Sequence, residues 1–215
     1  MPIFLLLKEY WLKVPLGDNK TGTLRINAIM QESTDTRFHQ NKGINLSTGQ
    51  IIGMLNADDY FADDTVLSSV ADIFNNNPAD IVYGNLDYIN STGKTVRKWR
   101  SGVYKPGMFN SGWMPPHPTF YCKRDLFDQF GLYSLDYGTA ADYQLMLRFM
   151  HVNKTNAFYL PQVMVKMKNG GSSNKNIRNR VKGFLYDFKA MRNNGILFPI
   201  MTLIAKPLRK ILQYF

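Results

Sequence analysis

The sequence predicts an α/β fold in which a sheet with parallel strands is flanked by helices. Three observations lead to this expectation. Residues 50–55 form a short apolar run typical of a buried strand, residues 66–74 carry apolar residues at helical spacing, and residues 79–89 form a second strand-like run. A right-handed crossover between parallel strands is the most economical way to join such elements. With 215 residues, 45% of them apolar, the chain can bury a sizeable core without disulfides or metals.

The first 43 residues mix apolar and charged side chains without a sustained period, so we assign no element there. The helix after the first strand follows Asp63 and Asp64, which suit an N-terminal cap. Its apolar stripe consists of Val66, Leu67, Val70, Ile73 and Phe74. After the second strand, "NSTGK" predicts a turn that leads into "TVRKWR".

The second half of the chain predicts further strands and helices. A strand in "PTFYCK" precedes a short helix over residues 124–130, which Gly131 ends. The run "TAADYQLMLRFMHV" predicts a strong helix, and "AFYLPQVMVKMK" predicts strands broken at Pro161. The run "NGGSSNKN" predicts a loop before a helix over residues 177–192. The apolar tail contains the cations Lys206, Arg209 and Lys210.

Charge and cysteine content limit the functional classes. Lys and Arg number 26 against 16 Asp and Glu, and the net charge of +10 favours polyanions or anionic membrane surfaces. Nucleic acid, nucleotide-sugar phosphates and lipid headgroups are all candidates at this point. Because the single Cys122 cannot form an internal disulfide, and no secretory signal or apolar run of about 20 residues is evident, we expect a cytoplasmic protein.

Polar residues follow the first predicted strand at the edge where open α/β sheets bind ligands. Asn56, Asp58 and Asp59 lie there, and adjacent carboxylates repel each other unless a cation or several donors share them. Mg²⁺ or Mn²⁺ would hold carboxylates together with the oxygens of a diphosphate. The alternative is a loop in which the aspartates cap a turn, and the Asp-Asp pair alone favours that alternative.

The sequence around the two aspartates makes the ligand-binding interpretation stronger than the turn-capping one. The pair belongs to "NKGINLSTGQIIGMLNADDYFADDTV", and "ADIVYGNLDYI", "HPTFYCKRDLFDQFGLYS" and "GTAADYQLMLRF" follow in order. Together, over residues 41–190, they resemble family 2 glycosyltransferases of the GT-A fold. The resemblance implies a Rossmann-type mixed sheet flanked by helices. The residues that match the donor-site region are Asn41, Gly43, Gly49, Leu55, Asn56, Asp58 and Asp59.

The resemblance implies roles for individual residues. Asn56 and Asp58 hold the divalent metal, Mn²⁺ or Mg²⁺, and reach the ribose or diphosphate of a nucleotide-sugar donor, with Asn in place of the family's first Asp. Asp59 orients these neighbours. Asp142 matches the catalytic base near a helix start, where a negative charge is favoured. Without the resemblance, a helix N-cap is the preferred interpretation of Asp142.

Four further residues are candidates on the same basis. Trp113 and His117 would bind the acceptor by sugar stacking and hydrogen bonding, although a packed histidine is an equal alternative for His117. Arg178 and Arg180 follow a loop near the donor diphosphate, and a guanidinium matches phosphate oxygens well. Solvated surface is the competing interpretation for each arginine.

The activity implied by the resemblance is inverting glycosyl transfer by direct displacement, in cell-surface polysaccharide synthesis. The donor is a nucleotide sugar, and the acceptor is a saccharide or a lipid-linked acceptor. No Ser or Cys nucleophile elbow is present, in agreement with a mechanism that has no covalent intermediate. A nucleic-acid-binding protein is the weakest alternative, because only the charge supports it and no recognition motif is evident. We therefore expect no nucleic-acid partner.

The beginning of the chain departs from the family pattern. Residues 1–40 lack the expected nucleobase-binding strands in good form, as in a truncated or disrupted beginning. Three segments are therefore expected: an atypical segment over residues 1–40, a GT-A-like domain over residues 41–195 and a basic apolar tail over residues 196–215. The first segment leaves an inactive remnant or binding subunit as the alternative function. The tail suits peripheral attachment to the inner membrane surface, or docking on the domain itself.

Overall fold

The computed structural model describes residues 6–16, 20–30, 36–56, 59–168 and 177–214. Up to residue 39, at residues 177–180 and at residue 212 the description covers the backbone alone.

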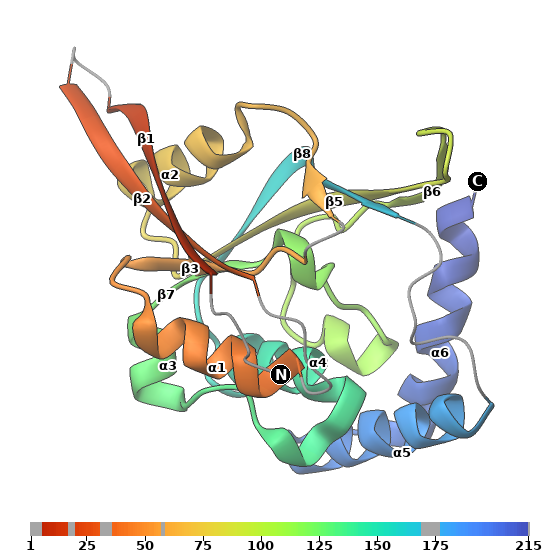
Figure 1. The fold of residues 1–215 in the computed structure, drawn as a ribbon. Coiled ribbons are helices and arrows are strands. Elements are labelled where there is room, and N and C mark those ends of the chain that lie inside the picture. The colour runs from red at the N-terminus through yellow and green to blue at the C-terminus, as the bar shows by residue number, and fades with distance from the viewer. Residues whose placement is uncertain (1–5, 17–19, 31–35, 57–58, 169–176, 215) are drawn as a thin grey trace, which may run out of the picture.

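A six-stranded mixed sheet forms the centre of the described structure (Figure 1). The strands are β3 (Ile51–Gly53), β4 (Tyr60–Phe61), β5 (Ile81–Ile89), β6 (Thr95–Trp99), β7 (Tyr121–Lys123) and β8 (Ala157–Lys168). Their order is β3-β7-β5-β8-β4, with β6 also paired to β5. Strands β5 and β8 are parallel, and the remaining pairs are antiparallel. Since β3 and β5 both run antiparallel to β7, they share one direction, as predicted, but β7 lies between them.

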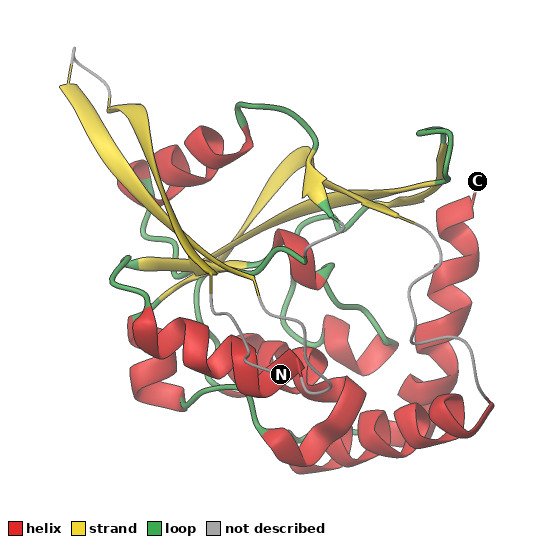
Figure 2. Ribbon diagram, viewed as in Figure 1, coloured by secondary structure: helices red, strands yellow, loops and turns green. Residues whose placement is uncertain are grey.

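Helices cover both faces of this sheet, as the predicted α/β fold requires (Figure 2). Helix α2 (Val66–Asn76) lies on one face, and α1 (Thr36–Leu46), α3 (Asp125–Phe130), α4 (Ala141–Met146) and α5 (Ile177–Asn193) lie on the other side. A π-helical segment over Leu147–Val152 continues α4. Helix α6 (Pro199–Ile211) runs beside β6 and carries the 3₁₀ turn Leu212–Tyr214. Three more 3₁₀ turns occupy Met108–Ser111, His117–Thr119 and Leu135–Ala140.

Two hydrophobic clusters form the core, one on each face of the sheet. Because side chains alternate along a strand, β5 contributes to both of them. Ile81 and Tyr83 join the larger cluster with α3, α4 and α5, whereas Val82 and Leu86 pack against α2. The apolar stripe predicted for α2 is confirmed at Val66, Val70 and Ile73, and Gly131 ends α3 with a φ of 91°.

The prediction that Pro161 breaks the last strand is wrong. Strand β8 runs continuously past it, and the register to β5 shifts instead: Tyr83 is opposite Tyr159, but Asn85 is opposite Val163. Proline has no N–H for the ladder, and a local bulge tolerates that loss.

The first residues do form elements, although the sequence predicted none. Strands β1 (Leu6–Leu16) and β2 (Lys20–Met30) pair as an antiparallel hairpin outside the central sheet, and α1 follows them. In the part of the chain that the structure describes, no helix is both long and apolar enough to cross a membrane.

Candidate active site

Asp142 lies in the first turn of α4, and its carboxylate faces His117. The distance between His117 Nδ1 and Asp142 Oδ2 is 3.6 Å, and 38% of the Asp142 side chain remains exposed. The alternative that Asp142 is the N-cap does not hold, because Ala140 occupies that position. The carboxylate is therefore both positioned and accessible, as a general base must be.

His117 is fixed from its other ring nitrogen. Nε2 lies 2.7 Å from the hydroxyl oxygen of Tyr133, and the two rings meet edge to face. Burial, aided by the nearby charge of Asp142, raises the pKa of Tyr133 well above its ordinary value, so this phenol keeps its proton. When the phenol donates to Nε2, the ring proton resides on Nδ1, which faces Asp142.

Tyr133 is in turn held by α1. The side-chain nitrogen of Asn41 donates to the Tyr133 carbonyl at 2.8 Å, and the Tyr133 N–H donates to Asn41 Oδ1 at 2.9 Å. Asn41 was expected in the donor-site region from the resemblance. The structure places it behind Tyr133, so an ordered series of contacts runs from Asn41 through Tyr133 and His117 to Asp142.

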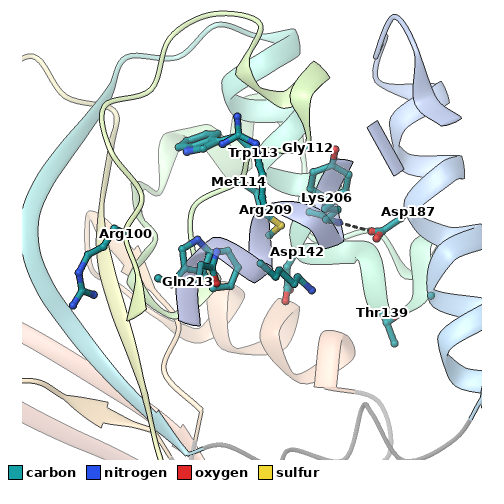
Figure 3. Close-up of a pocket in the computed structure, with 14 residues that line it drawn as sticks. Arg100, Gly112, Trp113, Met114, Thr139, Asp142, Asp187, Lys206, Arg209 and Gln213 are labelled. Carbon is teal, nitrogen blue, oxygen red and sulfur yellow. Dashed lines mark hydrogen bonds and ion pairs between the residues drawn. The ribbon is translucent and has the colours of Figure 1, made fainter. Parts of the chain in front are cut away.

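A pocket of about 410 Å³ opens beside Asp142 (Figure 3). Segments that are far apart in the sequence build it, from β6 to the 3₁₀ turn after α6. Its lining residues are Trp99, Arg100, Gly112, Trp113, Met114, Thr139, Asp142, Tyr143, Gly183, Asp187, Lys206, Arg209, Lys210 and Gln213. This volume and the mixed lining are typical of a site for a small polar ligand.

Trp113 borders the pocket but is mostly packed inside the protein. Only 5% of the residue is exposed, and its ring stacks on Tyr104 at a centroid distance of 5.2 Å. Its indole N–H donates to the Ser101 carbonyl at 2.8 Å. The predicted sugar stacking by Trp113 remains a prediction, with little ring surface available for it.

Helix α6 contributes the cationic wall of the pocket. Lys206 Nζ lies 2.7 Å from Asp187 Oδ1 on α5 and 3.6 Å from the centre of the Tyr143 ring. Burial lowers the pKa of Lys206, and the charge of Asp187 opposes that shift. At the rim, partial burial and then the charge of Arg97 lower the pKa of Lys210. The sequence alone did not connect α6 with the site.

The predicted donor edge is only partly visible. Asn56 Nδ2 donates to Asp59 Oδ2 at 2.7 Å, and the Asp59 N–H donates to the Asn56 carbonyl at 3.1 Å. Asp59 is 7% exposed. Asp58 lies outside the described residues. Arg178 and Arg180 begin α5, but their side chains are outside the description as well, so their roles remain predictions.

Arg124 fixes the strand that leads to this edge. Its guanidinium donates to the carbonyls of Gly49 at 2.9 Å and Ile44 at 3.1 Å, and also to Ser47. These bonds tie the end of α1 to the start of β3. The sequence missed this role, because a lone arginine before a helix gives no signal of its distant partners.

No group of three or more His, Cys, Asp or Glu side chains suited to a metal ion occurs among the residues whose positions are described. The loop nevertheless offers suitable chemistry, since carboxylate and amide oxygens are the ligands that Mg²⁺ and Mn²⁺ prefer. The hydrogen bond from Asn56 Nδ2 to Asp59 directs the Asn56 amide oxygen away from that carboxylate. Asn56 therefore fits a place beside a metal.

One comparison with known proteins agrees with the resemblance. Residues 40–135 match the family described as glycosyl transferase family 2. The crystal structure of S. aureus TarS 1-349 is similar at 9% sequence identity and a TM-score of 0.46, covering 83% of this chain and 72% of that chain. No curated protein matches. The family match supports the resemblance over residues 40–135, and it ends before Asp142 and the cationic wall of α6.

Proposed function

We propose that this protein is a family 2 glycosyltransferase with an inverting mechanism. It moves a sugar from a nucleotide-sugar donor to a hydroxyl group of a saccharide or lipid-linked acceptor, in the synthesis of a cell-surface polysaccharide. The observation that carries this proposal is the Asp142 carboxylate, which is partly exposed beside a pocket of about 410 Å³ and lies 3.6 Å from His117 Nδ1.

Asp142 acts as the general base in a single displacement. An acceptor hydroxyl in the pocket gives its proton to the Asp142 carboxylate, and its oxygen forms a bond to the anomeric carbon of the donor sugar. The bond from that carbon to the diphosphate oxygen breaks on the opposite face, and its electron pair leaves with the nucleoside diphosphate. His117 keeps the carboxylate oriented through this step.

The donor side depends on the loop after β3. Asn56 and Asp58 would hold Mg²⁺ or Mn²⁺, and Asp59 would fix Asn56 through the hydrogen bond between them. The metal, when bound, supplies positive charge to the leaving diphosphate. Arg178 and Arg180, at the start of α5, are the candidates for a direct contact with phosphate oxygens.

The test is the release of nucleoside diphosphate from a panel of UDP- and GDP-sugars, with Mn²⁺ or Mg²⁺ present and absent. Asp142→Asn should lower the transfer rate by about 10²- to 10⁴-fold, the usual contribution of a general base. The affinity for UDP or GDP, measured by calorimetry, should change little. Asp128→Asn, at an exposed carboxylate on α3, is the matched control and should keep its rate.

Two results would refute this mechanism: an unchanged rate in Asp142→Asn, or a product with retained anomeric configuration by NMR. If neither UDP nor GDP binds with Mn²⁺ present, the alternative of a non-catalytic binding subunit is favoured instead.

The proposed location is the cytoplasm, with peripheral attachment at the inner membrane surface. Helix α6 and the residues before it expose a row of large apolar side chains, each more than half exposed: Leu197, Phe198, Ile200, Met201, Ile204, Leu208 and Ile211. An apolar helix face on a chain of charge +10 suits an anionic bilayer surface.

Liposome pelleting tests this location. The variant Ile200→Ser/Ile204→Ser/Leu208→Ser should lose pelleting with anionic vesicles. Val103→Ser, at a residue outside α6 that is 65% exposed, should pellet like the unmodified protein. Equal pelleting of all three proteins would rule out attachment through α6.

A further inference from the structure

We propose that the pocket at Asp142 binds a phosphate group of the acceptor, through Arg209 and Lys210. This inference rests on the proposed function, because it assigns the acceptor to the pocket that contains the general base. It adds a chemical class to that acceptor: a saccharide that carries a phosphate near the hydroxyl to be glycosylated.

The charge of the pocket is the first observation. Four cations line it, Arg100, Lys206, Arg209 and Lys210, against only two carboxylates, Asp142 and Asp187. Lys206 and Asp187 neutralise each other at 2.7 Å. Arg100 pairs with Asp87, which is not a lining residue, at 2.6 Å. Arg209 and Lys210 are thus left as a positive pair at the α6 end of the pocket.

These two cations have no carboxylate of their own. Arg209 donates from Nε to the Ser111 carbonyl at 2.9 Å and from Nη2 to Ser111 Oγ at 3.0 Å, and both acceptors are neutral. Within the described part of the chain, the Lys210 ammonium has no hydrogen-bond or ion-pair partner at contact distance, although it feels the charge of Asp187. The contacts with Ser111 preorganise the guanidinium and leave its charge uncompensated, which suits recognition of an external oxyanion.

The position of the pocket assigns this oxyanion to the acceptor rather than to the donor. Asp142, which takes the acceptor proton, lines the pocket, whereas Asn56 and Asp59 of the donor edge do not. The volume of about 410 Å³ lies near the lower end of ligand sites. It suits a sugar phosphate better than a complete nucleotide sugar. Trp99 offers an aromatic surface in the same lining.

Calorimetry on the full chain tests the inference with glucose 1-phosphate and the neutral methyl glucoside as probes. Glucose 1-phosphate should bind about tenfold more tightly, because charge-assisted hydrogen bonds form only with the phosphate. Arg209→Gln and Lys210→Gln should each weaken that binding by about fivefold or more. Lys98→Gln removes an exposed positive charge of β6 outside this pocket and should leave binding unchanged.

Competition with UDP and Mn²⁺ separates the two possible sources of phosphate. Glucose 1-phosphate should remain bound when UDP is saturating, and UDP affinity should be unchanged in Arg209→Gln and Lys210→Gln. Displacement by UDP would overturn the inference, since the site would then hold the donor diphosphate. Equal affinity for the two sugar probes would overturn it as well. The proposed transfer reaction survives either result, because Asp142→Asn tests it independently.

Discussion

The donor edge and the acceptor pocket are built in opposite ways. At the donor edge, Asn56 and Asp59 are three residues apart and pair with each other. At the acceptor pocket, which is the pocket beside Asp142, that carboxylate lies next to His117. The α6 residues that line the same pocket follow Asp142 by more than 60 residues in the chain. A contiguous motif keeps its local geometry through neighbouring backbone bonds. The pocket depends on long-range packing. Substitutions at positions far from Asp142 in the sequence should therefore disturb the pocket, while the donor edge should tolerate substitutions far from its own residues.

The largest effect should follow Gly112→Ala. Gly112 has a φ of 76°, and a Cβ there would lie 2.6 Å from the backbone nitrogen and 2.8 Å from the Cα of Lys206. The strained φ and the forced displacement of α6 should together lower the free energy of unfolding by about 3 kcal/mol. Urea denaturation measures this loss, and the transfer rate should fall with it.

Gly102→Ala is the matched control for this substitution. Gly102 has a similar φ of 68°, but a Cβ there would meet nothing within 4 Å. Gly102→Ala should therefore lower the free energy of unfolding through backbone strain alone, by about 1 kcal/mol. Equal losses in the two variants would show that α6 is not closely packed at Gly112.

Lys206→Met should have the next largest effect. It removes the cation that faces Asp187 and leaves a largely buried carboxylate without its partner. We expect the free energy of unfolding to fall by about 2 kcal/mol. This is less than at a fully buried ion pair, because one fifth of the Asp187 side chain is exposed. The double variant Lys206→Met/Asp187→Leu should recover most of this lost stability, as measured by urea denaturation. If the double variant is less stable than either single variant, the pair does not hold α6 to α5.

Local patterns in the sequence predicted some of the elements that carry the site, but not its assembly. The strand before Asn56, helix α2 and the stop at Gly131 all follow from spacing or backbone chemistry that acts within a few residues. The position of Asp142 next to His117 agrees with the proposed role of a base, although its catalytic role remains a prediction.

The remaining features depend on partners that the sequence pattern does not specify. Lys206 in an amphipathic tail looks like a solvated charge, and only the packing of α6 on α5 makes it a buried one. Tyr133 is one aromatic residue among many, and its role depends on two partners 16 and 92 residues away. Asp58 lies outside the described residues, so its role as a metal ligand stays a prediction from the resemblance.

Tyr133→Phe should have a smaller effect on stability and a distinct effect on rate. His117 Nε2 loses its buried partner, which should cost about 1 to 2 kcal/mol. Without that bond His117 orients Asp142 less well, so kcat should fall by about tenfold while the affinity for UDP stays constant. Tyr137→Phe removes an exposed hydroxyl contact with Asn193 and serves as the control. An unchanged kcat in Tyr133→Phe would show that Asp142 needs no orientation by His117.

Asp59→Asn should have the smallest effect on stability, because the donor edge is local. An amide oxygen at this position still accepts from Asn56 Nδ2, so the free energy of unfolding should change by less than about 1 kcal/mol. The lost charge should instead raise the Mn²⁺ concentration needed for half-maximal UDP binding by about threefold or more. Asp64→Asn, at an exposed carboxylate, is the control and should leave that concentration unchanged. A large loss of stability with an unchanged Mn²⁺ requirement would mean that Asp59 supports the fold rather than the metal loop, and the contrast between the two sides of the site would disappear.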